Sequence, residues 1–275
     1  MGKISIIIPT HNRSSLLKRA AESVLNQNYS NLEIIIIDDA STDDTKEVIQ
    51  SINDKRIVYI RNSTNKGANF SRNTGLKKST GEYIAFLDDD DYYSDETKLK
   101  KQVELFHENK NLVFCGCGYF DKSTGKKRFP VVKGNISEKL LLNYSDIETS
   151  TILIKSKTIE KIGFLDEKLP SEQNHDFFYR ISKKGEFDFI DEIMVIKDEP
   201  ETQISSNPKN KVIGYILYHK KHFKDIKKLG FKKMLFTFFK TNIVTFLFLT
   251  SILFRGNIKA IQIIDELIKN KKHKT

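Results

Sequence analysis

The ten residues Glu82-Tyr-Ile-Ala-Phe-Leu-Asp-Asp-Asp-Asp91 join a continuous apolar run to four consecutive acidic residues. An apolar run of this length, without alternating polar positions, is typical of a strand buried on both faces. Neighbouring carboxylates repel one another, and a bound divalent cation relieves that repulsion. The segment therefore predicts a buried strand whose carboxyl end carries a cation-binding site.

The same pattern extends toward the N-terminus, where apolar runs alternate with helical patterns and short connections. The predicted strands are residues 4–8, 33–37, 57–60 and 82–87, and the predicted helices are residues 14–27, 43–52 and 68–78. Ser41 or Thr42 is expected to cap the second helix. This alternation predicts an α/β fold with a doubly wound, mostly parallel sheet.

Polar clusters follow three of these strands: PTHNR at 9–13, DDASTDDT at 38–45 and DDDD at 88–91. Ligands of doubly wound sheets bind outside the carboxyl ends of the strands, so the three clusters should converge. If residues 88–91 are extended, alternate aspartates point the same way and one pair can share a ligand. Carboxylate oxygens suit Mg²⁺ or Mn²⁺. No G-x-G-x-x-G motif follows the first strand, which disfavours a dinucleotide enzyme.

The pattern is weaker downstream of residue 100. Residues 112–120 and 127–132 flank Asp-Lys-Ser-Thr-Gly and predict a hairpin, and residues 149–154, 186–190 and 193–196 predict further strands. Cys115 and Cys117 have no second cysteine pair to complete a zinc site, so we interpret them as core residues.

Composition indicates a globular protein, because 39% of the 275 residues are apolar and 30% are charged. Two cysteines exclude a disulfide framework and suit a reducing compartment. The apolar run at the N-terminus is too short for a signal peptide. These features predict an intracellular protein.

The basic charge is confined to the last quarter of the chain. Residues 206–275 contain 16 Lys or Arg and 3 Asp or Glu, a net charge of +13, whereas residues 1–205 carry 30 − 33 = −3. A polar stretch at 201–208 predicts a linker at the same place. We therefore expect a body at residues 1–205 and a basic helical tail at residues 206–275.

The tail favours contact with an anionic membrane. Its uncharged run, residues 241–254, has 14 residues, fewer than the roughly 18–20 of a spanning helix. Lysine-rich flanks around a Phe- and Leu-rich stretch are typical of a helix in the membrane interface. The alternative is a helix that packs on the body or on a second copy of the chain, as in a homo-oligomer. Nucleic-acid binding is disfavoured because the aromatic residues lie in apolar runs.

The segments ISIIIPTHNR, LNQNYSNLEIIIIDDASTDDT and NKGANFSRNTGLKKSTGEYIAFLDDDD resemble, in order and spacing, the nucleotide-sugar half of the family 2 glycosyltransferases. TSTILIKSKTIEKIGFLDEKLP and NHDFFYRISKKG resemble the acceptor half more loosely. The resemblance implies the inverting GT-A fold, Rossmann-like, with the nucleotide-sugar half at residues 1–110 and the acceptor half at residues 111–205. It covers about 200 residues and stops before the tail.

The resemblance implies roles for individual residues. The loop that cradles the nucleoside base would contain Pro9, His11 and Arg13, and Asp39 would accept a hydrogen bond from uracil. The remaining implied contacts to the nucleotide sugar are Gly67, Arg72, Asp88 and Asp89. Asp88 and Asp90 match the family's DXD motif, which would hold Mn²⁺ or Mg²⁺ against the diphosphate.

An inverting transfer needs a general base to accept the proton of the acceptor hydroxyl. The base position that the resemblance implies falls on Asn174, which cannot accept a proton at neutral pH. The alternatives are Asp176, Glu172 and His175, of which we prefer Asp176 and then Glu172. Asp176 could equally cap a helix, and His175 could be an ordinary surface residue.

The sequence therefore predicts a metal-dependent inverting hexosyl- or N-acetylhexosaminyltransferase. It would transfer a sugar from a UDP-sugar to a glycan or lipid-linked acceptor in surface polysaccharide synthesis, at the cytoplasmic face of the cell membrane. A catalytically inactive nucleotide-sugar-binding partner is the alternative. A nucleotidyltransferase is a third possibility, disfavoured because no Gly- and Lys/Arg-rich triphosphate loop lies near the N-terminus.

Overall fold

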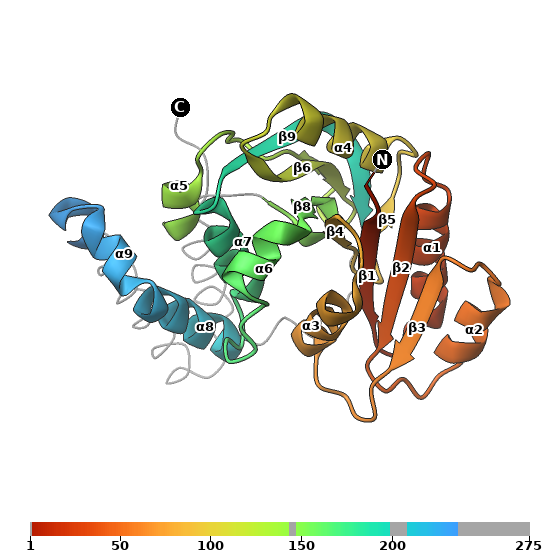
Figure 1. Ribbon diagram of the computed structural model, residues 1–275. Helices are drawn as coiled ribbons and strands as arrows, with labels where there is room; N and C mark the ends of the chain where they lie inside the picture. The colour runs from red at the N-terminus through yellow and green to blue at the C-terminus, as the bar shows by residue number, and fades with distance from the viewer. Residues whose placement is uncertain (1, 143–146, 199–207, 236–275) are drawn as a thin grey trace. The chain divides into compact units, whose positions relative to one another are not determined.

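The computed structural model describes residues 2–142, 147–198 and 208–235 (Figure 1). The chain divides into two compact units that interleave along the sequence. Unit 1 comprises residues 1–135, 146–165 and 180–201, and unit 2 comprises residues 136–145, 166–179 and 202–275. Unit 2 contains residues 208–235 of the predicted tail together with two segments of the predicted acceptor half.

One mixed sheet forms the centre of unit 1, with the strand order β3-β2-β1-β4-β8-β6-β9-β5 and with β7 paired to β6. Its strands are β1 (Ile4–Thr10), β2 (Leu32–Asp38), β3 (Ile57–Arg61), β4 (Tyr83–Phe86), β5 (Tyr92–Tyr93), β6 (Leu112–Asp121), β7 (Lys126–Arg128), β8 (Leu153–Lys155) and β9 (Glu186–Lys197). Among these strands β1 to β4 pair in parallel, so the predicted doubly wound sheet is confirmed for this part.

The parallel strands owe their central place to isoleucine-rich runs that are buried on both faces. Ile7 pairs with Ile35 on one side and with Phe86 on the other, and all three side chains are at most 1% exposed. In Figure 1, α3 (Ala68–Lys78) covers one face of these strands, and α1 (Ser14–Leu25) and α2 (Thr45–Ser51) cover the other. From β1 the chain adds β2 and then β3 on one side, and it adds β4 on the other side of β1. A doubly wound sheet binds ligands at such a switch point, here between β1 and β4.

The other side of the sheet is mixed. β8 runs antiparallel to both β4 and β6, whereas β9 runs parallel to β6 and antiparallel to β5. The hairpin of β6 and β7 is confirmed, although β7 ends at Arg128. Two helices, α4 (Lys98–Glu108) and α6 (Ser156–Ile162), belong to this part of unit 1.

Two strand predictions in this region were wrong. Residues 149–151 form a 3-10 turn instead of the start of a strand, because Thr151 Oγ1 and its backbone N–H both bond to Glu148 O. Residues 186–197 form one strand, β9, instead of two. Asp191 and Glu192 are exposed and lie at an irregularity of β9, where the pairing with β6 passes from Cys117 and Ile190 to Gly118 and Ile193.

Unit 2 is helical in its described residues. It contains α5 (Ser137–Leu141), the first part of α7 (Gln173–Ser182), α8 (Pro208–Lys221) and α9 (Phe223–Lys228). Gly214 lets α8 approach the loop before α7, because a Cβ at this position would lie 2.8 Å from the backbone N and O of Ser171. Val212, Tyr215 and Tyr218 are at most 1% exposed, so α8 packs within unit 2.

The predicted basic helical stretch is thus confirmed for α8 and α9. Among the helices of residues 2–142, 147–198 and 208–235, none is long and apolar enough to cross a membrane. The linker 201–207 and the apolar run 241–254 lie outside the described residues.

Candidate functional site

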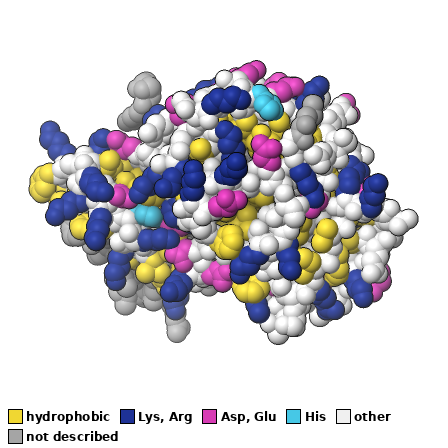
Figure 2. Space-filling view, in the orientation of Figure 1, with side chains coloured by type: hydrophobic (Ala, Val, Ile, Leu, Met, Phe, Trp, Pro, Cys, Tyr) yellow, Lys and Arg dark blue, Asp and Glu magenta, His cyan; other side chains and the backbone are white. Residues whose placement is uncertain are grey.

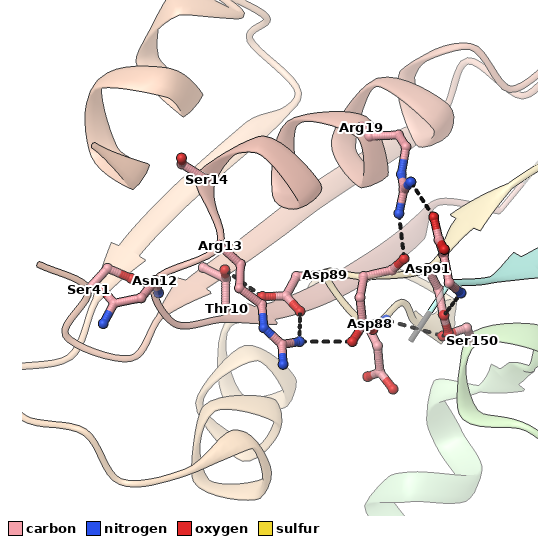
Figure 3. A network of polar contacts seen from close by, with 12 residues as sticks. Thr10, Asn12, Arg13, Ser14, Arg19, Ser41, Asp88, Asp89, Asp91 and Ser150 are labelled. Carbon is pink, nitrogen blue, oxygen red and sulfur yellow. Dashed lines mark hydrogen bonds and ion pairs between the residues drawn. The ribbon is translucent and has the colours of Figure 1, made fainter. Parts of the chain in front are cut away.

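The four aspartates after β4 form a turn at the carboxyl end of the parallel strands (Figure 3). The backbone N–H of Asp91 donates to Asp88 O at 3.0 Å, which closes the turn. The prediction that alternate aspartates point the same way assumed an extended segment and was therefore wrong, because residues 88–91 form a turn. The turn brings the side chains of Asp89 and Asp90 within reach of a single guanidinium group.

That guanidinium group belongs to Arg13, which follows β1. Arg13 Nη1 donates to Asp89 Oδ1 at 3.0 Å and to Asp90 Oδ2 at 2.8 Å. Thr10, the last residue of β1, donates from Oγ1 to Asp89 Oδ2 at 2.7 Å. The end of β1 and the acidic turn therefore meet, as the convergence of strand ends predicted.

A second arginine approaches the turn from α3. Arg72 Nη2 pairs with Asp88 Oδ1, and Arg72 Nη1 donates to Asn69 Oδ1 at 3.2 Å. Arg72 is 7% exposed, and its buried Nε has no hydrogen-bond partner among the described residues. The two ion pairs leave Asp88 and Asp90 each facing one arginine.

The site carries more negative charge than its arginines offset. Burial, together with the charges of Asp88 and Asp89, raises the pKa of Asp90 to about 6. Burial also raises the pKa values of Asp89 and Asp91, with the charge of Asp88 adding to the effect. A cation bound at this turn would lower all three pKa values.

The turn is anchored from behind by Arg19, which was not predicted, and by Ser150, which lies in the segment that resembles the acceptor half. Arg19 of α1 donates from Nη2 to the backbone O of Asp90 and from Nη1 to Asp198 Oδ2, both at 2.6 Å. Ser150 Oγ donates to Asp91 Oδ2 at 2.6 Å and accepts from the backbone N–H of Asp88 at 3.2 Å (Figure 3). No motif marked these contacts, because they join residues 59 or more positions apart.

Asp39 holds the loop that leads into α3. Its carboxylate accepts hydrogen bonds from the backbone N–H groups of Lys66 at 3.0 Å and Gly67 at 2.6 Å, and from Asn62 Nδ2 at 2.7 Å. Gly67 has φ +87°, a conformation that favours glycine, so it serves the turn into α3. Asp39 is 3% exposed. It fixes the backbone that leads into α3, the helix that carries Arg72.

The loop after β1 is tied to the loop after β2 by Asn12, a residue of the PTHNR cluster. Asn12 Oδ1 accepts from the backbone N–H of Thr42 at 2.6 Å, and the Asn12 N–H donates to Ser41 Oγ at 2.9 Å. Asn12 has φ +54°, which a short amide side chain tolerates. Neither Ser41 nor Thr42 caps α2 through its side chain, so that prediction was wrong.

Pro9 and His11 lie on either side of the end of β1. Pro9 is inside the strand, paired with Ile37, and so does not belong to the loop as predicted. His11 belongs to the loop, and its buried Nδ1 has no hydrogen-bond partner among the described residues. An orphaned ring nitrogen at a strand end is a position where a ligand group can bond.

The candidate bases lie in unit 2, whereas the acidic turn lies in unit 1. Asp176 of α7 is fully buried; Lys221 Nζ lies 2.9 Å and His222 Nε2 lies 2.7 Å from Asp176 Oδ1. Glu172 precedes α7, is half-buried and has φ +64°. His175 lies at the start of α7, where its Nε2 contacts Leu140 O.

The residues of the turn fit a divalent cation that completes its shell with ligands from outside the protein. The part of the chain that the structure describes contains no cluster of three or more His, Cys, Asp or Glu around one position. Asp88 and Asp90 supply two carboxylates, and Mg²⁺ typically takes one or two and leaves the rest to water and phosphate. After burial, the charges of Asp88 and Asp89 are the next causes that raise the pKa of Asp90, so a cation at the turn would meet neighbouring negative charges.

A sequence model of "Glycosyl transferase family 2" matches residues 5–163, which include β1 to β4 and the acidic turn. The chain belongs to glycosyl transferase family 2. The residues that carried the predicted resemblance are those that converge at the carboxyl ends of the parallel strands.

Curated members of family 2 are similar to this chain over different shares of its length. WfaP of Escherichia coli, a UDP-Glc:α-D-GlcNAc-diphosphoundecaprenol β-1,3-glucosyltransferase, is 39% identical over 60% of this chain and 65% of its own. The chain thus spans just under two thirds of WfaP. The putative colanic acid biosynthesis glycosyl transferase WcaA of E. coli K12 is 32% identical over 86% of this chain and 87% of its own.

Solved structures share the fold at low identity. S. aureus TarS 1–349 in complex with UDP-GlcNAc has a TM-score of 0.66 and 18% identity over 78% of this chain and 66% of that one. The mannosyltransferase PcManGT from Pyrobaculum calidifontis, in complex with GDP-Man and Mn²⁺, has a TM-score of 0.65 and 15% identity over 97% and 74%. The GT-A fold that the sequence predicted is therefore confirmed.

Proposed function

We propose that this family 2 member transfers a hexosyl or N-acetylhexosaminyl group from a UDP-sugar, with inversion, to a glycan or lipid-linked acceptor of surface polysaccharide synthesis. One observation carries the proposal: the polar ends of β1 and β4 meet at an acidic turn whose charge is only partly offset, and Asn12 ties the loop after β1 to the loop after β2. The names of WfaP and WcaA support the reaction class and the pathway.

The donor site would lie at the carboxyl ends of β1, β2 and β4. His11 offers an orphaned ring nitrogen, and Arg13 and Arg72 offer guanidinium groups beside the place proposed for the diphosphate. Asp39 and Gly67 would shape the base pocket through the loop that they share. TarS, which has the same fold, was solved with UDP-GlcNAc.

Asp88 and Asp90 would hold Mn²⁺ or Mg²⁺, with Asp89 kept in place by Thr10 and Arg13. The cation would offset the charge that develops on the diphosphate leaving group. Arg13 and Arg72 would contribute to the same charge balance from the protein side, since both already face the turn.

The acceptor-side base is proposed to be one of the two acids of the α7 region. Asp176 is fully buried and paired with Lys221 and His222, which suits a positioning role, whereas Glu172 is half-buried. Substitution separates them: the base variant, Glu172→Gln or Asp176→Asn, should lower kcat while UDP affinity is unchanged. The positioning variant should instead lower the free energy of unfolding.

Calorimetric titration of UDP tests the donor site. We expect binding with Mn²⁺ that is weakened at least tenfold by EDTA or by Asp90→Ala, while Asp44→Ala, at an exposed position before α2, serves as the matched control. Metal-independent binding that Asp90→Ala leaves intact would remove Asp90 from its role. Binding of GDP but not of UDP would show that the donor is a GDP-sugar and not a UDP-sugar.

An inactive nucleotide-sugar-binding protein is the second candidate, favoured by Asn174 at the expected base position and by the full burial of Asp176. Assays of UDP-sugar hydrolysis and of sugar transfer to lipid-linked acceptors distinguish the transferase from the inactive binding protein. UDP-sugar binding without turnover on any acceptor, in wild type as in Glu172→Gln, would favour the binding protein.

We further propose that the reaction takes place at the cytoplasmic face of the cell membrane and that the C-terminal tail contacts the membrane. WfaP by its name acts on a diphosphoundecaprenol acceptor, which is a lipid. A lipid-linked acceptor requires an enzyme that works at a membrane surface.

A further inference from the structure

The segment from Phe223 to Leu235 exposes an unusual share of apolar side chains. In the described part of the chain six large hydrophobic side chains are exposed, and three of them, Phe223 (50%), Phe231 (71%) and Leu235 (37%), lie in these 13 residues. The other three are single residues elsewhere: Val58, Val131 and Phe164. Scattered exposed apolar residues are ordinary, whereas a group of them marks a contact surface.

Lysines surround these apolar side chains. Residues 208–235 contain nine lysines and one acidic residue, Asp225, and all seven lysines between 220 and 233 are exposed. Figure 2 shows dark-blue side chains around yellow ones over the region of α8 and α9. Exposed aromatics among lysines match a surface that is apolar at its core and anionic at its boundary, which describes an anionic lipid bilayer.

The inner side of the same segment is attached to α7. Lys221 Nζ bridges Asp166 Oδ2 at 2.7 Å and Asp176 Oδ1 at 2.9 Å, and His222 Nε2 lies 2.7 Å from Asp176 Oδ1. Tyr179 Oη donates to Asp225 Oδ2 at 2.9 Å. Phe223 follows His222 directly, so the exposed face begins one residue after the contact with α7.

We propose that the exposed face of residues 220–235, with Phe223, Phe231 and Leu235 among lysines, docks on an anionic phospholipid bilayer. Because Lys221, His222 and Asp225 bind α7, docking holds the candidate acceptor helix at a set place relative to the lipid surface. The inference rests on the proposed lipid-linked acceptor and deepens it by naming the residues that meet the membrane.

The test measures co-sedimentation of the full chain with vesicles of phosphatidylcholine alone or with 30% phosphatidylglycerol, at about 0.15 M salt. The charge variant is Lys227→Gln/Lys232→Gln and the apolar variant is Phe223→Ser/Phe231→Ser. Matched controls are Lys126→Gln/Lys127→Gln on β7 and Val131→Ser/Phe164→Ser, exposed positions of unit 1. Circular dichroism establishes that each variant is folded.

We expect wild type to bind the anionic vesicles and not the neutral ones. Each lysine near an anionic surface contributes about a fivefold gain in affinity, so the charge variant should bind roughly 25-fold more weakly. The apolar variant should lose at least tenfold, and neither control should change. UDP affinity should stay the same throughout.

Two results would overturn the docking proposal: patch variants that bind vesicles as wild type does, or wild type that binds neither vesicle. Binding to a DNA duplex as tight as to vesicles, and unaffected by Phe223→Ser/Phe231→Ser, would show a general polyanion surface and also overturn it. Loss of UDP binding with vesicle binding intact would refute the proposed function and leave the docking surface standing.

Discussion

At the scale of single residues, Arg13 already pairs with Asp90, one of the two carboxylates that we propose to hold the cation. Its Nη1 joins Asp89 and Asp90, both of which have raised pKa values because of burial and neighbouring carboxylates. Arg13 therefore offsets part of the charge that a divalent ion would meet.

We expect Arg13→Gln to bind Mn²⁺ about tenfold more tightly than wild type at pH 8 without nucleotide, because a competing positive charge is removed. Electron paramagnetic resonance of free Mn²⁺ measures this. Arg56→Gln, whose arginine pairs with Asp54, is the control and should leave Mn²⁺ affinity unchanged. Weaker binding in Arg13→Gln would show that Arg13 supports the cation site.

Glu33 provides a pH-dependent contribution to stability. Burial alone would raise its pKa, but hydrogen bonds from Lys3, Ser5 and Thr80 outweigh burial and lower it. A carboxylate with a lowered folded pKa stabilises the fold above its unfolded pKa of about 4.3, and this stabilisation is lost as pH falls through the folded pKa.

Glu33→Gln should therefore lower the free energy of unfolding by about 1–3 kcal/mol at pH 7 and by progressively less below pH about 4. Urea denaturation at pH 7, 5 and 3.5 tests both statements. Glu22→Gln, at an exposed position of α1, should change little. A deficit that is the same at all three pH values would contradict the assignment.

At the scale of elements, a buried carboxylate of α7, that of Asp176, contacts His222 at the junction of α8 and α9. His222→Phe keeps the aromatic packing against Tyr179 and Tyr218 but removes the ring nitrogen beside Asp176. We expect a loss of about 1–3 kcal/mol in the free energy of unfolding. Lys220→Gln, an exposed neighbour, should stay within about 0.5 kcal/mol of wild type.

A double-mutant cycle makes this prediction specific. If His222 and Asp176 interact, Asp176→Asn should cost less in the His222→Phe background than in wild type. Equal costs in the two backgrounds would show that the 2.7 Å contact does not contribute to stability.

Sequence reasoning was most successful where the apolar period was clear. The strands at Ile4–Thr10 and Leu32–Asp38 and the helix at Ala68–Lys78 match their predicted positions within two residues. β5 was missed because two residues carry no period. The 3-10 turn at residues 149–151 was mistaken for a strand because it is decided by hydrogen bonds to Glu148, which the sequence does not show.

The candidate site was predictable where a motif marked it. Asp88, Asp89, Asp90 and Arg13 converge as expected, because carboxyl ends of parallel strands share one edge of the sheet. Arg19 was not predicted, and neither was the contact of Ser150 with Asp91, since these roles depend on tertiary contacts alone. The same holds for His222, whose partner Asp176 is 46 residues away.

At the scale of the whole molecule, residues 208–235 belong to the same compact unit as the first part of α7. Unit 2 draws on three separate segments of the chain, and α8 supplies buried Tyr215 and Tyr218 to it. A chain that ends at residue 207 should therefore lose more than about 3 kcal/mol in the free energy of unfolding, since Asp176 then lacks Lys221 and His222.

A chain that ends at residue 235 keeps these contacts and should retain wild-type stability and UDP affinity. Urea denaturation and UDP titration of the two shortened chains check both expectations. A chain ending at 207 that is as stable as the full protein would show that unit 2 does not depend on α8.

The interleaving of the two units sets an order on folding during translation. All strands of the β1–β4 sheet have left the ribosome once Phe86 has emerged. Asp176, in contrast, cannot pair with His222 until the ribosome has synthesised 46 further residues. At roughly 5–20 residues per second, that delay is about 2–9 s. A nascent chain spends this time with a finished parallel sheet and an unfinished helical unit, the kind of intermediate that chaperones bind. Rare codons between residues 180 and 222 would lengthen that exposure.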